Sequence, residues 1–192
     1  RLMGMDFNRI QFTPDVVPSD VTGFTMYEKQ TGRFIYRPGA VMCNMLLADE
    51  INRTSSKTQA ALLEVMEEGK VTVDNETHPV PQPFVVIATE NPTGSSGTQM
   101  LPESQLDRFM ISLSMGYPDH ENRLERRRDR QTKKPLENAK AVITKEEVVM
   151  LQDQVQKVYM ADSILNYIAT LAEATRNHPM ITLGLSPRGT LA

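Results

Sequence analysis

The chain of 192 residues has a single cysteine, Cys43, no tryptophan and no long apolar run. One cysteine excludes an internal disulfide framework and most cysteine-based zinc sites. The longest apolar stretches, such as residues 84–88, fall far short of the roughly 20 residues that a membrane helix needs. No basic segment followed by an apolar one opens the chain, so secretion has no support and we expect a soluble, cytoplasmic protein.

A strong excess of one charge is also absent. The 21 lysines and arginines against 24 aspartates and glutamates leave a net charge of −3, which gives no general reason to expect nucleic-acid binding. Residues 123–134 are locally basic, but no aromatic side chain is interleaved with the cations. We therefore interpret this segment as a solvated helix face rather than a nucleic-acid patch.

The order of the periodic segments predicts an α/β protein, with a parallel sheet first and helices after it. Short apolar runs predict four strands, at 9–12, 45–48, 84–88 and 111–115. The runs at 45–48 and 84–88 are unbroken, which is typical of strands buried on both faces. Turn residues predict two hairpins, at 24–36 and 71–80. Prolines predict a loop at 13–23, and a helix is predicted over 55–68 with Gly69 as its end.

From about residue 119 the pattern is helical. We expect helices over 119–130, over 144–158 with a Thr144–Glu147 capping box, and over the apolar stripe at 164–172, which we interpret as core. Ser186 and Pro187 suit the start of a helix that the chain has no room to complete. We therefore expect a piece of a longer protein, with an α/β domain at 1–118 that is incomplete at its N-terminus and a helical domain at 119–192 that is incomplete at its C-terminus.

Polar side chains follow both of the unbroken apolar runs. Asp49 and Glu50 come directly after the first run, and Asn91 comes shortly after the second. Ligands of parallel sheets bind beyond the carboxyl ends of the strands. The pattern suits metal-assisted phosphoryl transfer, with Asp49 holding Mg²⁺ through water, Glu50 polarising the attacking water and Asn91 orienting it. The alternative for the two carboxylates is a strand that ends in charge where it reaches solvent.

Two arginines add to this hypothesis. Arg108 lies between Leu106 and Phe109, whose packing would hold its guanidinium at a fixed place, as charge neutralisation in phosphoryl transfer requires. The alternative is an ordinary ion pair with Asp107 or another neighbour. Arg188 lies in the first turn of the last predicted helix, where a bound anion would be its natural partner. Its alternative is a solvated side chain at a fraying end.

Together these segments resemble an AAA+ ATPase, and closely the MoxR family. The resemblance spans nearly the whole chain, and its motifs are Leu46–Arg53, Lys57–Glu64, Ala88–Pro92, Leu101–Phe109 and Leu185–Arg188, with further similarity at 9–15 and 18–20. It implies an AAA+ core of the P-loop type followed by a partial helical lid. It also implies a Walker B pair, with Asp49 on Mg²⁺ and Glu50 as catalytic base. Asn91 would be sensor 1, Arg108 an arginine finger reaching the nucleotide of the next subunit, and Arg188 sensor 2.

One part of the family pattern is missing. The phosphate-binding Gly-x-x-x-x-Gly-Lys-Ser/Thr loop, Walker A, does not occur. The glycine-rich stretch 94–98 lacks the lysine and follows the wrong strand. In the family the loop precedes the segment that ends at residues 1–3, so its absence agrees with a truncated chain.

The resemblance implies a function for the full-length protein. We expect a hydrolase that binds ATP and Mg²⁺, forms a ring of subunits, a hexamer by analogy, and acts as a chaperone-like factor in the maturation or assembly of protein complexes. Its partners would be a protein client and a protein with a von Willebrand factor A domain. The fragment alone is expected to be inactive. The alternatives are a non-catalytic interaction module with the same fold, and a DNA-remodelling or transcription-activating AAA+ relative.

Overall fold

The structure is a computed structural model that describes residues 2–91, 100–114, 116, 119 and 140–191. The predicted helix beyond Asp119, its basic segment and the glycine-rich stretch 94–98 lie outside the described residues. Among the described residues, no helix combines the length and the apolar character that a membrane span requires.

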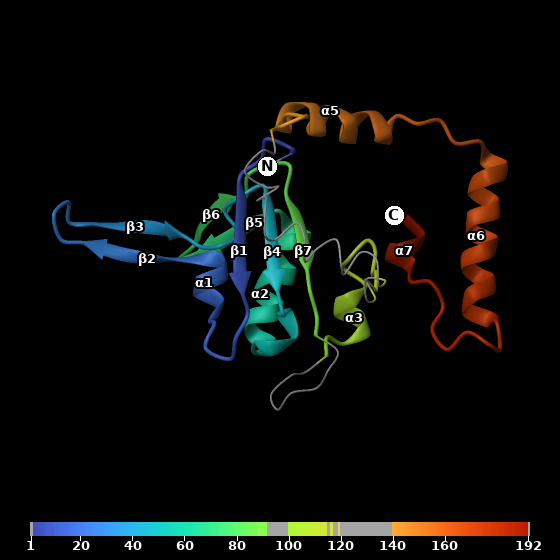
Figure 1. Ribbon diagram of the computed structural model, residues 1–192, viewed down its shortest axis with the longest axis horizontal. Helices are drawn as coiled ribbons and strands as arrows, with labels where there is room; N and C mark the ends of the chain where they lie inside the picture. Colours follow the sequence, from blue (N-terminus) through green and yellow to red (C-terminus); the bar gives the residue numbers. More distant parts are fainter. Residues whose placement is uncertain (1, 92–99, 115, 117–118, 120–139, 192) are drawn as a thin grey trace.

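A parallel sheet of three strands forms the centre (Figure 1). Its strands are β1 (Phe7–Gln11), β4 (Met45–Asp49) and β7 (Val85–Ala88), and β4 lies between the other two. The predicted strands at 9–12, 45–48 and 84–88 are therefore confirmed. The strand predicted at 111–115 is wrong for its described residues, 111–114, which form no strand. Ile111 and Leu113 are 70% and 80% exposed, so their apolar character reflects no place in the sheet.

One face of the sheet carries the core. Leu46 and Ala48 of β4 point to this face and are fully buried, together with Leu62 and Leu63 of helix α2 (Ser56–Glu68). On the opposite face, Phe7 and Ile87 remain 56% and 49% exposed. The prediction that the unbroken apolar runs are buried on both faces is thus wrong for this face, because strand side chains alternate and only one face is covered in the part of the chain described.

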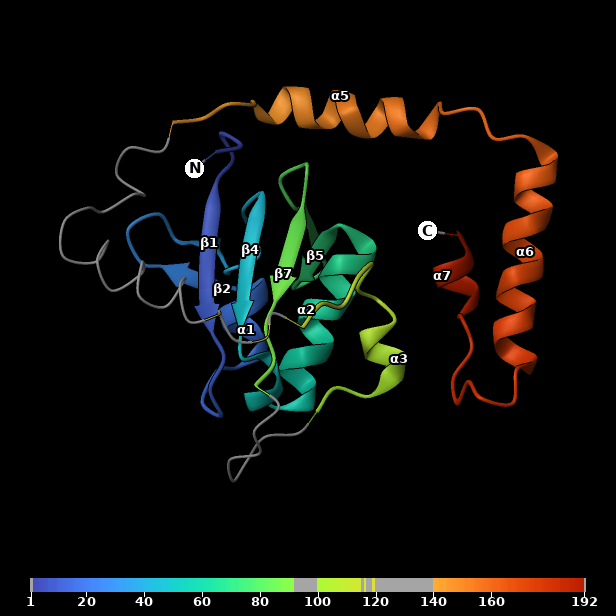
Figure 2. The same cartoon turned by 45° about the vertical axis from the view of Figure 1, so that its right-hand side comes forward.

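Helix α2 has the ends that the sequence predicts. Ser55 is its N-cap and accepts a hydrogen bond from the amide of Thr58, while Gly69 ends it with a positive φ of 64°. Glycine adopts this left-handed conformation without the steric cost of a Cβ atom. The helix packs against one face of the sheet (Figure 2).

Two antiparallel hairpins extend from the core. The first joins β2 (Gly23–Glu28) to β3 (Arg33–Pro38), and the second joins β5 (Lys70–Val73) to β6 (Glu76–Pro79). Both hairpins were predicted from their turn residues, and the second turns on Asp74 and Asn75 with positive φ angles of 49° and 67°. The rings of Tyr36 and His78 stack 3.8 Å apart and connect the two hairpins.

A short helix, α1 (Pro18–Thr22), lies where a loop was predicted. Proline suits the first helical turn because its missing N–H has no partner there in any helix. The carboxylate of Asp20 accepts a hydrogen bond of 2.9 Å from the amide of Val17 and fixes the start of the helix. The prolines in this stretch therefore mark a helix start and not only a loop.

The remaining elements are helical. They are α3 (Glu103–Leu106), α5 (Lys145–Gln156), α6 (Asp162–Asn177) and α7 (Pro187–Leu191). The Thr144–Glu147 capping box of α5 is confirmed. The prediction that the stripe on α6 is core is wrong within the described residues, because Ile164, Leu165 and Leu171 are 48%, 51% and 47% exposed and only Ala172 is buried. In Figure 1, α5 and α6 lie at the periphery, away from the sheet. The division of the chain at residue 118 stays a prediction.

Candidate active site

The Asp49 carboxylate lies at the carboxyl end of the central strand and has two hydrogen-bond donors. The Thr89 hydroxyl donates to its Oδ1 at 2.5 Å, and the Arg9 guanidinium donates to its Oδ2 at 2.6 Å. These two bonds, and the positive charge of Arg9, hold the pKa of Asp49 below its ordinary value against the opposing effect of burial. Asp49 is therefore ionised at neutral pH.

Glu50 follows in an unusual backbone conformation. Its φ of 54° and ψ of 49° are left-handed, a region that costs a residue with a side chain about 1–2 kcal/mol. This residue ends the strand and turns the chain into a short 3-10 helix, Ile51–Arg53. Its Oε2 atom accepts hydrogen bonds from Gln11 at 2.9 Å and from Arg53 at 2.7 Å. Strained backbone that the surrounding structure holds in place is frequent at functional sites.

Arg9 and Gln11 also belong to this site, although neither was predicted to have a role there. Strand β1 pairs in parallel with β4, and its last residue, Gln11, lies opposite Asp49. Arg9 is two residues earlier and therefore on the same face of the sheet. The signal for both was the alternation of polar residues at positions 9 and 11, but its meaning depends on the pairing of β1 with a strand about 40 residues away. Thr89, within a motif of the resemblance, was likewise given no role.

Asn91 lies beside the same edge. After β7 ends, the amide of Thr89 still donates to the carbonyl of Ala48 at 2.9 Å, and the amide of Ile51 donates to the carbonyl of Thr89 at 3.0 Å. The side chain of Asn52 then bonds the backbone of Asn91. The segments that carry Asp49, Glu50 and Asn91 thus run side by side, as their positions after neighbouring strands predict.

Arg108 and Arg188 lie elsewhere, at the end of α2. Glu67 binds both: its Oε2 lies 3.2 Å from Nη1 of Arg108, and its Oε1 lies 2.8 Å from Nη2 of Arg188. Gln59, near the start of α2, contacts the carbonyl of Ile51 beside Glu50. Glu67 lies eight positions after Gln59, which corresponds to about 12 Å of helix rise. The structure therefore does not bring either arginine to the carboxylate edge, the end of β4 that carries Asp49 and Glu50.

The surroundings of the two arginines differ from the predicted ones in detail. Phe109 packs against the core beside Arg108, as expected, but Leu106 is 39% exposed. The ion pair of Arg108 is with Glu67, while Asp107 lies 3.9 Å from Arg188 instead. Arg188 does lie in the first turn of α7, where the hydroxyl of Ser186 accepts from the amide of Gly189 at 2.9 Å. The anion that it binds here is a carboxylate.

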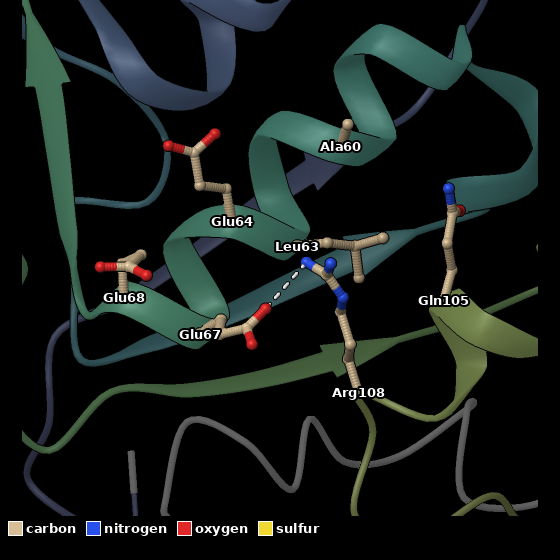
Figure 3. Close-up of a pocket in the computed structure, with 7 residues that line it drawn as sticks. All are labelled: Ala60, Leu63, Glu64, Glu67, Glu68, Gln105 and Arg108. Carbon is tan, nitrogen blue, oxygen red and sulfur yellow. Dashed lines mark ion pairs between the residues drawn. The ribbon is translucent and has the colours of Figure 1, made fainter. Parts of the chain in front are cut away.

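A pocket of ≈ 270 Å³ opens beside this cluster, between α2 and α3 (Figure 3). Its lining consists of Ala60, Leu63, Glu64, Glu67, Glu68, Gln105 and Arg108. In Figure 3 the Arg108 side chain reaches up to Glu67 across this pocket. Three glutamates make it a poor place for the phosphates of a nucleotide.

The residues of the carboxylate edge fit a magnesium ion. In the described ranges, no group of three or more histidines, cysteines, aspartates and glutamates is placed to hold a metal. Magnesium does not require such a group, because it is usually held by one or two carboxylates, several waters and substrate phosphates. Asp49, Glu50 and Thr89 offer carboxylate and hydroxyl oxygens of this kind. Arg9 now bonds the Oδ2 oxygen of Asp49, so a cation would share or replace it.

Comparisons with known proteins agree with this fold. Residues 1–111 match the family described as "ATPase family associated with various cellular activities (AAA)". The chain is also similar to the crystal structure, at 2.00 Å resolution, of a candidate ATPase from Cytophaga hutchinsonii. The TM-score is 0.86 at 38% identity, over 99% of this chain and 60% of the other. A match over more than half of the chain, on a parallel sheet with this edge, defines the class as that of the AAA ATPases.

Two curated relatives narrow the class. The chain is 53% identical over 190 residues to the uncharacterized protein YeaC of Bacillus subtilis, covering 99% of this chain and 59% of YeaC. It is 37% identical over 200 residues to the chaperone MoxR1 of Mycobacterium tuberculosis, covering 100% of this chain and 52% of that protein. The chain thus spans between half and three fifths of the length of these relatives. It belongs to the MoxR family of AAA ATPases.

Proposed function

We propose that this chain carries the hydrolytic half of an ATP site in a Mg²⁺-dependent ATPase. The observation that carries the proposal is the pair of adjacent carboxylates, Asp49 and Glu50, at the end of the central strand, with Asn91 beside them. When bound, Mg²⁺ neutralises part of the phosphate charge. Asp49, kept ionised by Thr89 and Arg9, holds the ion through water.

Glu50 is the catalytic base in this proposal. Its left-handed backbone carries the carboxylate past the end of β4, and Gln11 and Arg53 hold its Oε2 atom. Its other oxygen, Oε1, is the atom that would accept the proton of the attacking water. Asn91 orients that water from the neighbouring segment. Arg188, on the helical lid, 119–192, which follows the α/β domain, 1–118, is the sensor in this proposal; because Glu67 binds it beside Arg108 here, this role requires Arg188 to leave Glu67 when nucleotide binds.

Arg108 acts on a second copy of the chain in this proposal. It is bound at the far end of α2 from Glu50, so its role as an arginine finger requires a neighbouring subunit, as in a ring. A hexamer is the proposed ring. The sequence contains no Gly-x-x-x-x-Gly-Lys-Ser/Thr phosphate-binding loop, so residues 1–192 alone are proposed to be inactive.

At the level of the whole protein, we propose a cytoplasmic, chaperone-like role. One relative is named a chaperone, MoxR1. The corresponding substrate is a protein client, whose maturation or assembly the ATPase drives, and the proposed partner is a protein with a von Willebrand factor A domain.

The test is Glu50→Gln in the full-length protein. The substitution removes the base but keeps the size of the side chain and its hydrogen bonding, so nucleotide binding should persist while turnover falls by at least about 10²-fold. Glu173→Gln, on the exposed surface of α6, is the matched control and should leave turnover unchanged. If Glu50→Gln keeps turnover within about threefold of the unmodified protein, the proposed base is wrong, and a non-catalytic module becomes the better account.

A further inference from the structure

Asn52 is a fully buried polar residue whose side chain has no place in the roles described so far. Its relative exposure is 0%. Its Oδ1 atom accepts a hydrogen bond of 3.3 Å from the amide of Asn91, and its Nδ2 atom donates one of 3.1 Å to the carbonyl of the same residue. One side chain therefore binds both backbone polar groups of Asn91.

This contact follows from the way in which the pairing of β4 with β7 ends. Strands β4 and β7 pair as far as Ala48 and Ala88, and backbone bonds continue to Thr89. The left-handed conformation of Glu50 then breaks the regular ladder: the amide of Glu50 donates to the Thr89 hydroxyl, and the amide of Ile51 makes the last backbone bond, to the carbonyl of Thr89. The side-chain amide of Asn52 has the same donor and acceptor as a peptide group. The Asn52 side chain therefore adds a further pair of hydrogen bonds between the segment after β4 and the segment after β7, at a position that follows Glu50 in the chain.

Asn52 is itself held firmly. The side chain of Gln59, on α2, donates to the carbonyl of Ile51 at 3.1 Å and so holds the 3-10 helix, Ile51–Arg53, against α2. A buried amide cannot exchange its partners for water without opening the structure, so each lost bond leaves an unsatisfied group. The backbone of Asn91 is thus tied through Asn52 to the segment that carries Glu50.

We propose that Asn52 is a positioning residue for catalysis: it sets the place of Asn91 relative to Glu50. This inference rests on the proposed function, in which Asn91 orients the attacking water. A displacement of about 1 Å in such a group can lower a rate by about 10²-fold. Loss of the Asn52 side chain should therefore lower kcat without a matching change in nucleotide affinity.

The chain contains a matched control, Asn44, at the other end of β4. It is also 0% exposed, its Oδ1 accepts from the amide of Asp6 at 3.3 Å, and its Nδ2 donates to the carbonyl of Pro83 at 3.1 Å. Asn44 and Asn52 therefore have the same burial, and each bonds one backbone amide and one backbone carbonyl; Asn52 has one further contact, of 3.9 Å from its Nδ2 to the sulfur of Met100. Their removal should destabilise the protein to a similar degree, but only Asn52 lies beside Asn91.

The experiment compares Asn52→Ala, Asn44→Ala, Asn91→Ala and the double variant Asn52→Ala/Asn91→Ala in the full-length protein. ATP turnover gives kcat and KM, and denaturation gives stability. We expect kcat to fall by about 10- to 100-fold for Asn52→Ala, with KM within about threefold, and to stay within about threefold for Asn44→Ala. In the Asn91→Ala background, Asn52→Ala should add less than about threefold, because the two act through one group.

The outcomes separate the inference from the proposed function. If Asn91→Ala lowers kcat but Asn52→Ala behaves like Asn44→Ala, the positioning role is overturned and the proposed function stands. If Asn91→Ala has no effect, the proposed role of Asn91 fails and the inference fails with it. Should Asn52→Ala not fold, Asn52→Ser replaces it. Hydrogen exchange in the unmodified protein needs no variant: the Asn91 amide should exchange as slowly as that of Asp6, and fast exchange would overturn the inference.

Discussion

Replacement of Thr89 by valine should weaken the carboxylate edge in a way that depends on pH. The Thr89 hydroxyl donates to Asp49 at 2.5 Å and accepts from the amide of Glu50 at 2.9 Å. Valine has nearly the same shape but no hydroxyl, so Thr89→Val removes both bonds and leaves the amide of Glu50 without this acceptor.

The size of the effect follows from the type of these bonds. A hydrogen bond to a charged group contributes about 1.5–3 kcal/mol. The Asp49 side chain is 23% exposed and keeps the Arg9 guanidinium, so water and Arg9 compensate in part. We therefore expect Thr89→Val to lower the free energy of unfolding by about 2 kcal/mol at neutral pH.

The pH dependence has a defined sign. The hydrogen bond from Thr89 is the largest cause of the lowered pKa of Asp49 in the folded protein. A lowered folded-state pKa stabilises the protein above the unfolded-state pKa, and this contribution is lost as the pH falls through the folded-state value. The loss caused by Thr89→Val should therefore be full at neutral pH and should shrink below about pH 4, the region where an unfolded aspartate titrates.

The assay is urea denaturation over a pH series, with NMR titration of the Asp49 carboxyl group. Thr89→Ser is the control, because serine keeps the hydroxyl and loses only a methyl group. The pKa of Asp49 should rise in Thr89→Val and stay low in Thr89→Ser. The reasoning is refuted if the two variants are equally stable at neutral pH, or if the pKa of Asp49 is the same in both.

Two further predictions concern the arginines. In the full-length protein, the variants Arg108→Ala and Glu50→Gln should each be inactive alone. Mixed rings of the two should regain part of the ATP turnover, because an intact Glu50 can then meet an intact Arg108 of a neighbouring subunit. Mixed rings that demonstrably form and stay inactive would exclude an arginine finger that acts across subunits. Glu67→Gln should lower the free energy of unfolding by less than about 1 kcal/mol per ion pair, because surface ion pairs contribute little, and this loss should diminish in high salt. In denaturation experiments, a loss of several kcal/mol that does not depend on salt would contradict a surface role for these ion pairs.

The elements that the sequence predicts correctly have their signals within a few residues. Ser55 and Gly69 mark the two ends of α2, and the Asp74–Asn75 turn marks the second hairpin. Each signal acts through local backbone chemistry, such as a cap or a left-handed turn, which needs no knowledge of the rest of the fold. The prediction that the segments of Asp49, Glu50 and Asn91 lie side by side has a similar basis, because the end of a strand determines where the next residues lie.

The features that sequence reasoning missed depend on distant pairing. Arg9 reaches Asp49 only because β1 pairs with β4, and the 33 residues between these two strands carry no sign of this pairing. The stripe on α6 predicts a helix correctly, but periodicity does not identify what covers an apolar face. The proline at position 18 was misinterpreted because the same residue suits a loop and the first turn of a helix.

The position of Arg108 restricts how the proposed site can work. Helix α2 is capped at both ends, and its first turns contact the segment after Glu50 while its last turn holds Arg108. A capped helix packed on a sheet does not shorten, so about 12 Å of helix rise separates these contacts within one copy. A guanidinium stabilises a phosphoryl transition state only in direct contact with its oxygens. In the proposed function, Glu50 and Arg108 are therefore expected to act from two copies of the chain, each providing one of the two groups to a shared site.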